Sequence, residues 1–380
     1  MTVPPGARVL ISCGEASGDL YAAALVSAMR ARDPGVSVFG FGGARLKAAG
    51  ARLVGDYQGF SVTGLVEALA VLPRSYAMLR RLRRAAAAEP PDVFVAVDFP
   101  DFNFRLLPAM RRTGARIVYY VSPQIWAWRP RRLRTLRRYV DRMLVIFPFE
   151  VPFYEQAGVP VEFVGHPLID LAVAARSRDA WLPGLGLDPR RPVVGLLPGS
   201  RPNELHHLAP LLAAAAVQMA GTVPDVQFLV ARAPALSDAL LQPLEALRRA
   251  RIPYAAVEDA TDDVLAAADV VVTASGTATV QTALHGTPMV VVYRLSPITY
   301  ALAKRFVRVG TFGMVNLVAG RPVVPELIQD ALTPAAVARE AVALLTDRAR
   351  ADAMRRDLAE VRARLGAPGA SARAARAVLD

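Results

Sequence analysis

Two short polar stretches follow apolar runs of strand length, and their residue types suit the binding of an oxyanion. Gly199-Ser200-Arg201 follows the run 192–197, and Ser275-Gly276-Thr277 follows the run 269–274. Glycine lets a backbone approach an anion, hydroxyl and amide groups donate hydrogen bonds, and an arginine fork matches a phosphate. Two such loops in one sheet indicate a diphosphate-bearing ligand such as a nucleotide sugar. An ordinary helix N-cap is the alternative for each loop.

Polar side chains also follow two other apolar runs. Asp98 ends one of them, where a buried charge is costly unless it is hydrogen-bonded or used in chemistry. Asp98 is therefore the candidate general base, whereas Asp101 suits the capping of the next helix better. Glu15, Ser17 and Asp19 lie in GEASGD after the first run. That stretch is either a polar site loop or a strand-to-helix turn capped by Ser17 or Asp19.

The segments between these stretches must position them. Apolar runs of strand length alternate with helix-length segments, and runs that are apolar on both faces are typical of buried parallel strands covered by helices. The runs lie at 7–13, 36–40, 92–98, 116–121 and 141–147, and then at 192–197, 226–231, 269–274 and 289–294. The predicted fold class is α/β, with two Rossmann-like domains joined by a polar hinge at 175–192.

Composition limits the classes of protein. With 380 residues, 53% of them hydrophobic, the chain is expected to form two globular domains. The net charge of +12, from 45 Lys and Arg against 33 Asp and Glu, favours anionic partners. A GC-rich genome, which raises the arginine content, is an alternative cause of the charge. Cys13 is the single cysteine, which fits a reducing compartment. Without a signal peptide or an apolar run of about 18 residues, we expect a cytosolic protein, free or bound to a membrane face.

The histidines do not form a metal-binding pattern. The chain has four His and one Cys, with no two of these five residues at i,i+4 spacing and no H-E-x-x-H sequence, so no metal is expected. His206 and His207 are adjacent and would point in different directions on a helix. His166 is expected either to be a hydrogen-bonded structural residue or to orient a loop near the domain junction.

An aromatic stretch, YVSPQIWAWRP at 120–130, contains Trp126 and Trp128, which are two of the three tryptophans. Both rings could pack in the core, or they could form a wall for a sugar or an acyl chain. The residues alone leave the two interpretations open.

Taken together, the motifs resemble those of lipid A disaccharide synthase. They are GEASGD (14–19), FGG (41–43), GLVEAL (64–69), VDFPDFN (97–103), YVSPQIWAWRP (120–130), FPFE (147–150), FVGHPLID (163–170), LLPGSRPNEL (196–205), ASGTAT (274–279), VVYR (291–294) and NLVAGRPVVPELIQ (316–329). Their order and spacing cover nearly the whole chain.

This resemblance implies a GT-B glycosyltransferase, in which two Rossmann-like domains face each other across a cleft. Residues 1–174 would form the acceptor-binding, membrane-facing domain, and 175–354 the UDP-sugar-binding domain. A C-terminal helix at about 355–380 would pack back on the first domain. The enzyme would join UDP-2,3-diacylglucosamine to 2,3-diacylglucosamine 1-phosphate, with inversion and without a metal or other cofactor, giving a β-1,6-linked disaccharide and UDP.

The resemblance also assigns roles to single residues. Asp98 would be the base, with Glu15 beside it, and Arg201 would stabilise the leaving diphosphate. The nucleotide would be held by Gly199, Ser200, Arg201, Ser275, Gly276, Thr277, Gln281 and Asn316. The acceptor would meet Ser17, Asp19, Trp126, Trp128 and Arg129. Where the family usually has a ribose-binding glutamate, this chain has Gln281, which can accept one hydrogen bond and donate another.

A segment at 60–84 could face a membrane. Its first part is apolar, and its second part ends in Arg80, Arg81, Arg83 and Arg84. Core packing beside a solvated arginine face is the alternative. Diacyl sugars stay in the bilayer, so we expect peripheral, salt-sensitive binding to the anionic cytoplasmic face of the inner membrane.

Other functions stay open at this point. A UDP-sugar 2-epimerase shares the fold, and a related glycosyltransferase could use another lipid-linked acceptor. A basic nucleic-acid-binding protein would explain the charge, but the chain contains no recognisable DNA- or RNA-binding motif, so no nucleic acid is expected. A homodimer is an open alternative to a monomer.

Overall fold

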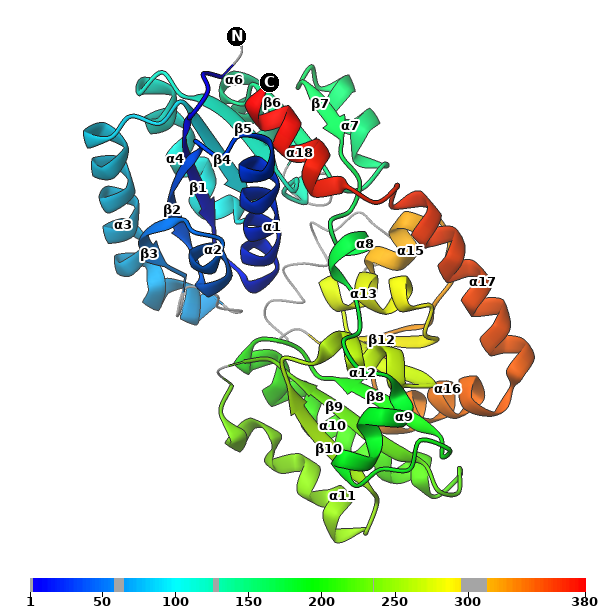
Figure 1. Cartoon of the computed structure of the whole chain (residues 1–380). Coiled ribbons are helices and arrows are strands. Elements are labelled where there is room, and N and C mark those ends of the chain that lie inside the picture. Colours follow the sequence, from blue (N-terminus) through cyan, green and yellow to red (C-terminus); the bar gives the residue numbers. More distant parts are fainter. Residues whose placement is uncertain (1–2, 58–64, 126–129, 235, 295–312) are drawn as a thin grey trace. The chain divides into compact units, whose positions relative to one another are not determined.

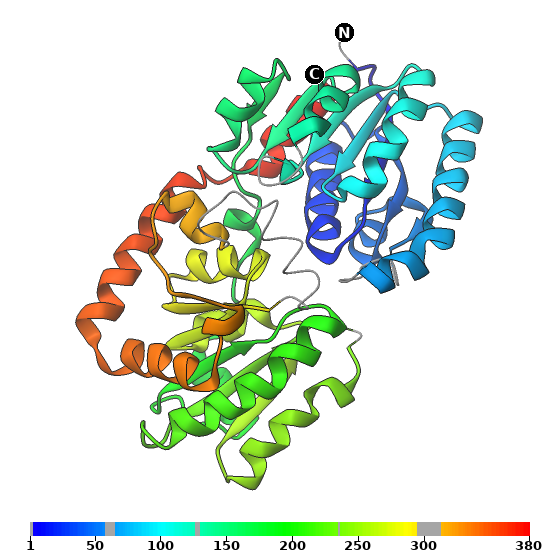
Figure 2. The same ribbon diagram turned by 180° about the vertical axis from the view of Figure 1, so that it is seen from behind.

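The computed structural model describes residues 3–57, 65–125, 130–234, 236–294 and 313–380. It divides into two compact units (Figures 1 and 2). The first unit contains the chain up to Asp170 together with Leu365–Asp380, and the second contains the described residues from Leu171 to Arg364. Each unit is built around one sheet of parallel strands.

The first unit has a seven-stranded sheet with the order β3-β2-β1-β4-β5-β6-β7. Its strands are β1 (Arg8–Cys13), β2 (Ser37–Gly42), β3 (Arg52–Asp56), β4 (Val93–Val97), β5 (Arg116–Tyr120), β6 (Arg142–Val145) and β7 (Val161–Phe163). Its helices are α1 (Ala16–Arg32), α2 (Ala44–Ala48), α3 (Leu65–Ala88), α4 (Pro100–Arg112), η1 (Pro130–Arg132), α6 (Leu133–Tyr139), α7 (Glu150–Gln156) and α18 (Ala370–Leu379), and the short α8 (Leu168–Leu171) lies at the boundary.

The second unit has a six-stranded sheet with the order β10-β9-β8-β11-β12-β13. Its strands are β8 (Val193–Leu197), β9 (Gln227–Arg232), β10 (Tyr254–Glu258), β11 (Val270–Ala274), β12 (Met289–Tyr293) and β13 (Glu326–Ile328). Its helices are α9 (Arg178–Trp181), η2 (Leu182–Leu185), α10 (Pro202–Ala220), η3 (Asp238–Leu244), α11 (Glu245–Arg249), α12 (Thr261–Ala267), α13 (Thr277–His285), α15 (Met314–Ala319), η4 (Gln329–Ala331), α16 (Pro334–Thr346) and α17 (Arg348–Arg364).

Burial of the central strands confirms the predicted α/β class. Every residue of β4, β8 and β11 is buried, as expected for parallel strands covered on both faces. In the first unit, α1 and α18 lie on one face of the sheet, while α3 and α4 pack on the other (Figures 1 and 2). All the strand-to-helix turns that carry the predicted site residues therefore leave the carboxyl edge of a sheet.

The C-terminal segment divides between the two units. The predicted single helix at 355–380 is two helices, of which α17 belongs to the second unit and α18 to the first. α18 packs along α1, and Arg32 pairs with Asp380 at 2.7 Å. The Arg373 guanidinium group donates to the Val164 carbonyl at 2.8 Å. These contacts tie the end of the chain to its first unit.

The stretch 175–192, which the composition predicts as a hinge, is tied into the second unit. The Asp263 carboxylate accepts from the N–H groups of Ala175 and Arg176, at 2.7 and 2.8 Å, and from the Arg176 guanidinium group. Arg178 pairs with Asp269 at 2.9 Å. The division between the compact units instead falls at Asp170 and Leu171.

His166 is buried in the first unit, near its end. Its ring lies edge-on to Tyr21 at 5.8 Å and against Phe147 at 5.2 Å, and its Nδ1 accepts from the Leu168 N–H at 3.2 Å. Burial lowers the pKa of His166 from 6.5 to about 3. The imidazole therefore stays neutral in the folded protein, as the structural interpretation predicted.

We expect this histidine to make the first unit sensitive to acid. The unfolded chain binds the proton near pH 6.5 and the folded chain only near pH 3. The contribution of neutral His166 to the free energy of unfolding is therefore complete above pH 6.5. It is lost as the pH falls toward 3, by at most about 1.4 kcal/mol per pH unit. Urea unfolding of His166→Gln should show a shallower fall in stability between pH 6.5 and 4.5. The exposed His206→Gln serves as the control, and equal slopes for both variants would contradict the assignment.

Candidate functional site

The turn after β8 is organised by a carboxylate that the sequence analysis did not single out. Gly199, with a φ of +119°, turns the chain away from the strand. Glu204 Oε2 accepts from the Ser200 N–H at 2.9 Å and from the Arg201 N–H at 3.3 Å, and its Oε1 meets Arg201 Nη1 at 3.0 Å. Glu204 thus engages both backbone amides of this turn and also pairs with the Arg201 guanidinium group, which has further N–H donors.

A glutamate three residues after the N-cap, with proline at the first helical position, is a sequence signal that could have revealed this arrangement. Arg201 is the N-cap of α10, Pro202 is its first residue, and Glu204 completes a capping box. The arrangement preorganises the loop before any ligand arrives.

The turn after β11 is more open. The Ser275 N–H donates to the Val292 carbonyl at 3.0 Å, which ties the turn to the neighbouring strand. Gly276 is the N-cap of α13, and within the part of the chain that the structure describes a Cβ built there would meet no other atom within 4 Å. Thr277 begins the helix, and the first N–H groups of a helix have no acceptor within it. An anion can therefore approach the positive end of α13 at this point.

Ionisable residues that follow β8 and β12 interact at the same edge of the second sheet. Tyr293, at the end of β12, has its pKa raised by burial and by the nearby Glu204 carboxylate. His207 has its pKa lowered by burial, by His206 and by Arg294. The turns after β8 and β12 are thus close enough to interact electrostatically, and Arg294 adds a cation that the sequence analysis did not assign.

Asp98 lies in a strained turn directly after β4. Asp98 and Phe99 have φ angles of +44° and +49°, a conformation that costs about 1–3 kcal/mol for a non-glycine residue. The main chain is held there because the Asp98 carbonyl accepts from Asn103 Nδ2 and Tyr119 Oη, both at 2.8 Å. The Asp98 side chain is only partly buried. Strain of this kind is typical of a functional turn.

The GEASGD turn after β1 packs against the Asp98 turn. The Phe99 ring lies where a Cβ on residue 14 would be, so Gly14 allows the two turns to touch. Glu15 is the N-cap of α1, and both Glu15 and Ser17 are partly exposed. The first unit therefore brings Glu15, Ser17 and Asp98 to one edge of its sheet.

Asp19 is instead used within the fold. It is 2% exposed, and its carboxylate accepts from the N–H groups of Gly43, Arg45 and Leu46 at 2.7, 3.0 and 3.2 Å. These bonds hold the start of α2 against α1. The geometry thus supports a positioning role for Asp19.

Asn316 is likewise enclosed. It is 2% exposed, its Oδ1 accepts from the N–H groups of Val323 and Val324, and its Nδ2 donates to Glu326 at 2.6 Å. Asn316 therefore braces the loop between α15 and β13. The predicted Trp126, Trp128 and Arg129 lie outside the described residues.

Gln281 contacts a carboxylate on the neighbouring helix. Its Nε2 donates to Asp262 Oδ1 at 3.3 Å and to Asp262 Oδ2 at 3.4 Å. His285 Nε2 lies 2.9 Å from the same Oδ1. No cluster of three or more potential metal-ligating side chains occurs within the ranges that the structure describes.

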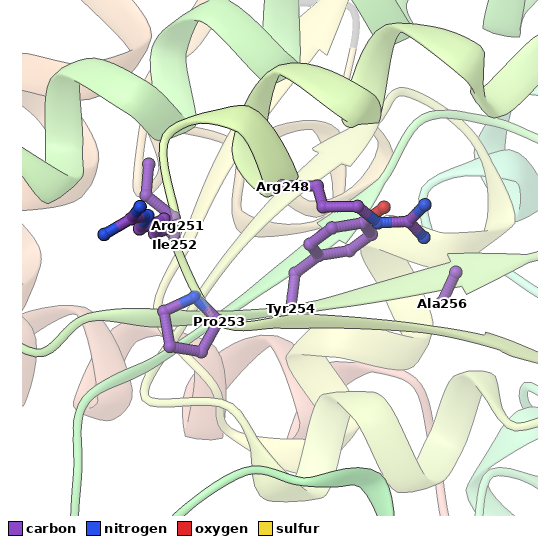
Figure 3. A pocket seen from close by; sticks show the side chains of 6 residues that line it. All are labelled: Arg248, Arg251, Ile252, Pro253, Tyr254 and Ala256. Atoms are coloured by element: carbon purple, nitrogen blue, oxygen red, sulfur yellow. The ribbon is translucent and has the colours of Figure 1, made fainter.

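A hollow of about 460 Å³ lies elsewhere on the second unit. It is lined by Arg248, Arg251, Ile252, Pro253, Tyr254 and Ala256, and Figure 3 shows the Arg248 side chain beside the Tyr254 ring. Tyr254 begins β10, so this hollow is at the amino edge of the sheet. It is therefore separate from the turns at the carboxyl edge.

Comparison with known proteins identifies the family. The family model described as lipid-A-disaccharide synthetase matches residues 9–379. The lipid-A-disaccharide synthase of Geobacter sulfurreducens is 44% identical over 380 residues, covering 100% of this chain and 98% of the relative. The enzyme of Trichlorobacter lovleyi is 45% identical, covering 100% and 99%. The chain belongs to the lipid-A-disaccharide synthase family. Members of this family are glycosyltransferases of lipid A biosynthesis, which confirms the resemblance seen in the sequence.

Solved structures confirm the fold class of this lipid-A-disaccharide synthase family member. The calicheamicin glycosyltransferase CalG4 has a TM-score of 0.61 and 21% identity, covering 98% of this chain and 97% of its own. A UDP-GlcNAc 2-epimerase from Neisseria meningitidis has a TM-score of 0.65 and 11% identity, covering 91% and 94%. At this low identity the similarity shows the fold only. The family match across residues 9–379 therefore favours the lipid-A-disaccharide synthase family over an epimerase.

Among the helices in the described part of this family member, none combines the length and the apolar character that a membrane span needs.

The Glu204 network predicts a measurable contribution to stability. Glu204→Ala should lower the free energy of unfolding of the second unit by about 1–2 kcal/mol, because the turn loses its cap. Glu204→Gln should lose less, because an amide oxygen can still accept from the Ser200 N–H. Urea unfolding measures both, with Glu245→Ala, from an exposed pair with Arg248 on α11, as the control. Wild-type stability in Glu204→Ala would show that the network does not hold the turn.

Proposed function

We propose that the chain transfers a diacylglucosamine unit from UDP-2,3-diacylglucosamine to the 6-hydroxyl of 2,3-diacylglucosamine 1-phosphate. The products are the β-1,6-linked disaccharide 1-phosphate and UDP, and the anomeric configuration is inverted. The observation that carries this proposal is the family match across residues 9–379. The retained polar turns at the carboxyl edges of both sheets support it.

In this proposal the first unit binds the acceptor, and Asp98 is the general base. The acceptor hydroxyl must lose its proton as its oxygen attacks the anomeric carbon, and a carboxylate in hydrogen-bond reach can take it. Asp98 suits this role because its turn is held rigidly by Asn103 and Tyr119 while its side chain stays partly exposed. Glu15 and Ser17 lie at the same edge, where they can orient the acceptor sugar.

The second unit binds the UDP portion of the donor. The open N-terminus of α13 at Gly276 and Thr277 offers backbone N–H groups to the diphosphate. Arg201, held by Glu204, adds a cation. As the bond to the sugar breaks, negative charge grows on the leaving diphosphate, and these groups stabilise it in the transition state. The proposal includes no metal, so EDTA should leave turnover unchanged.

The first test replaces the proposed base. Asp98→Asn should still bind UDP but should turn over about two to four orders of magnitude more slowly, because the amide cannot accept the proton. Mass spectrometry of products from the two lipid substrates measures turnover, and linkage analysis of the disaccharide identifies the bond. Asp101→Asn, a change in the same segment, is the matched control and should keep most of the activity.

Two results would contradict this account. Near-normal turnover in Asp98→Asn would remove the general base from the mechanism. A disaccharide formed only with a different lipid-linked acceptor would overturn the assignment of the acceptor.

We also propose that α3 binds the cytoplasmic face of the inner membrane peripherally. Leu72 and Tyr76 are 36% and 50% exposed, and Arg80, Arg81 and Arg84 are exposed on the same helix. Arg83 is already engaged, since it donates to the Arg105 carbonyl at 2.7 Å. Exposed apolar side chains can enter the interface while the arginines meet anionic headgroups, at about 1 kcal/mol each.

Cosedimentation with phosphatidylglycerol-containing vesicles tests this surface. The wild type should bind at low salt and dissociate as salt is raised. Changing Arg80, Arg81 and Arg84 to Ser should weaken binding by at least tenfold, because three favourable contacts are lost. The charge-matched control changes the exposed Arg190, Arg248 and Arg249 of the second unit to Ser. If both variants bind equally well, α3 is not the membrane-binding surface.

A further inference from the structure

The second unit contains a cluster of hydrogen-bonded side chains between α12 and α13. Asp262 lies in the first turn of α12, and its Oδ1 is 3.3 Å from Gln281 Nε2 and 2.9 Å from His285 Nε2, both on α13. On Oδ2, the contact among the described residues is a long one of 3.4 Å to Gln281. The side chains of Asp262 and His285 are 23% and 11% exposed. The carboxylate is thus fixed in direction while part of it stays accessible.

The neighbouring Asp263, and not Asp262, attaches α12 to the segment that precedes it. Asp263 is buried and is used by Ala175 and Arg176 of the preceding segment. Two adjacent aspartates on one helix therefore have different surroundings. Asp263 bonds to the backbone at 175–176, and Asp262 bonds to side chains of α13.

The cluster lies one helical turn from the open anion site. Thr277 begins α13, and Gln281 follows four residues later on the same face. Four residues advance a helix by about 6 Å, so Gln281 and the carboxylate that it contacts lie about one helical turn from the N-terminus of α13. Asp262 follows β10 and so leaves the same edge of the sheet as the turns after β8 and β11. A group of the ligand that lies about one helical turn from a bound diphosphate would meet this carboxylate.

We propose that Asp262, oriented by Gln281 and His285, accepts hydrogen bonds from the ribose hydroxyls of the donor nucleotide. The inference rests on the proposed function, because it requires a nucleoside diphosphate at the turn after β11. A carboxylate can accept hydrogen bonds from two hydroxyl groups, whereas the Gln281 side-chain amide donates its N–H to Asp262. Gln281 is then a positioning residue, and the carboxylate that the diol needs is supplied by α12.

Calorimetry with UDP, 2′-deoxy-UDP and 3′-deoxy-UDP tests the assignment. Wild-type protein should bind UDP about 10- to 100-fold more tightly than at least one deoxy analogue, because a hydroxyl bond to a charged acceptor is lost. Asp262→Asn should weaken UDP binding by a similar factor while changing the affinity for that analogue by less than about threefold, so that the preference disappears. A structural effect would weaken all three ligands equally.

Two further variants complete the experiment. Asp262→Glu keeps the charge and should retain part of the preference, which also covers the case in which Asp262→Asn does not fold. Asp225→Asn changes an exposed aspartate just before β9, at the opposite edge of the sheet, and should behave as the wild type. Melting temperatures verify that each variant is folded.

The outcomes separate this inference from the proposed function. If the wild type forms the disaccharide and prefers UDP, but Asp262→Asn keeps that preference, the role of Asp262 is overturned while the function stands. A wild type that forms product but binds UDP and both deoxy analogues equally overturns the role as well. If the wild type neither binds UDP nor forms product, both proposals fail together.

Discussion

A buried parallel strand offers no place for a charged side chain along its length, so chemistry is confined to the turn that follows it. Every residue of β4, β8 and β11 is buried. The chain leaves these strands at Asp98, at Gly199-Ser200-Arg201 and at Ser275-Gly276-Thr277. Because parallel strands end at the same edge, the direction of the strands alone places the polar turns of each sheet at that edge.

What makes these turns usable is that other polar groups hold them in place. Glu204 fixes the turn after β8, and Asn103 holds the strained main chain at Asp98. Asp19 and Asn316 brace neighbouring loops from buried positions. Catalysis by preorganised charges requires such support, because groups that must reorient during the reaction lose much of their effect. The side chains of several residues in the family motifs thus have partners within the fold that hold these turns and loops in place.

The apolar runs predicted the inner strands of both sheets, their parallel character and the turns that carry the polar residues, because apolar runs report burial directly. The edge strands β3, β7, β10 and β13 were not predicted. The sequence did not predict which polar side chain in a turn makes its hydrogen bonds within the protein. Asp19 and Asn316 were assigned to ligands. In the structure Asp19 accepts from backbone N–H groups, and Asn316 bonds to backbone groups and to the Glu326 carboxylate, which are partners that motif spacing alone does not identify. Glu204 was missed although its position three residues after the N-cap is a recognisable signal. The contact of Asp262 with Gln281 joins two separate helices, which the spacing of residues does not bring together. The division between Asp170 and Leu171 falls four residues before the predicted boundary at 174–175, and the polar stretch 175–192 begins with a segment that Asp263 holds in the second unit.

Hydrogen–deuterium exchange with and without UDP shows whether the nucleotide binds at the polar turns of the second sheet. UDP should slow exchange in peptides covering 275–284 and 199–204, where the helix N-terminus and the Arg201 turn lie at the carboxyl edge of that sheet. Peptides covering 221–226 and 249–253, at the amino edge, should exchange at unchanged rates. Protection at the amino edge with none after β11 would contradict the account, because the nucleotide would then bind where the polar turns are not.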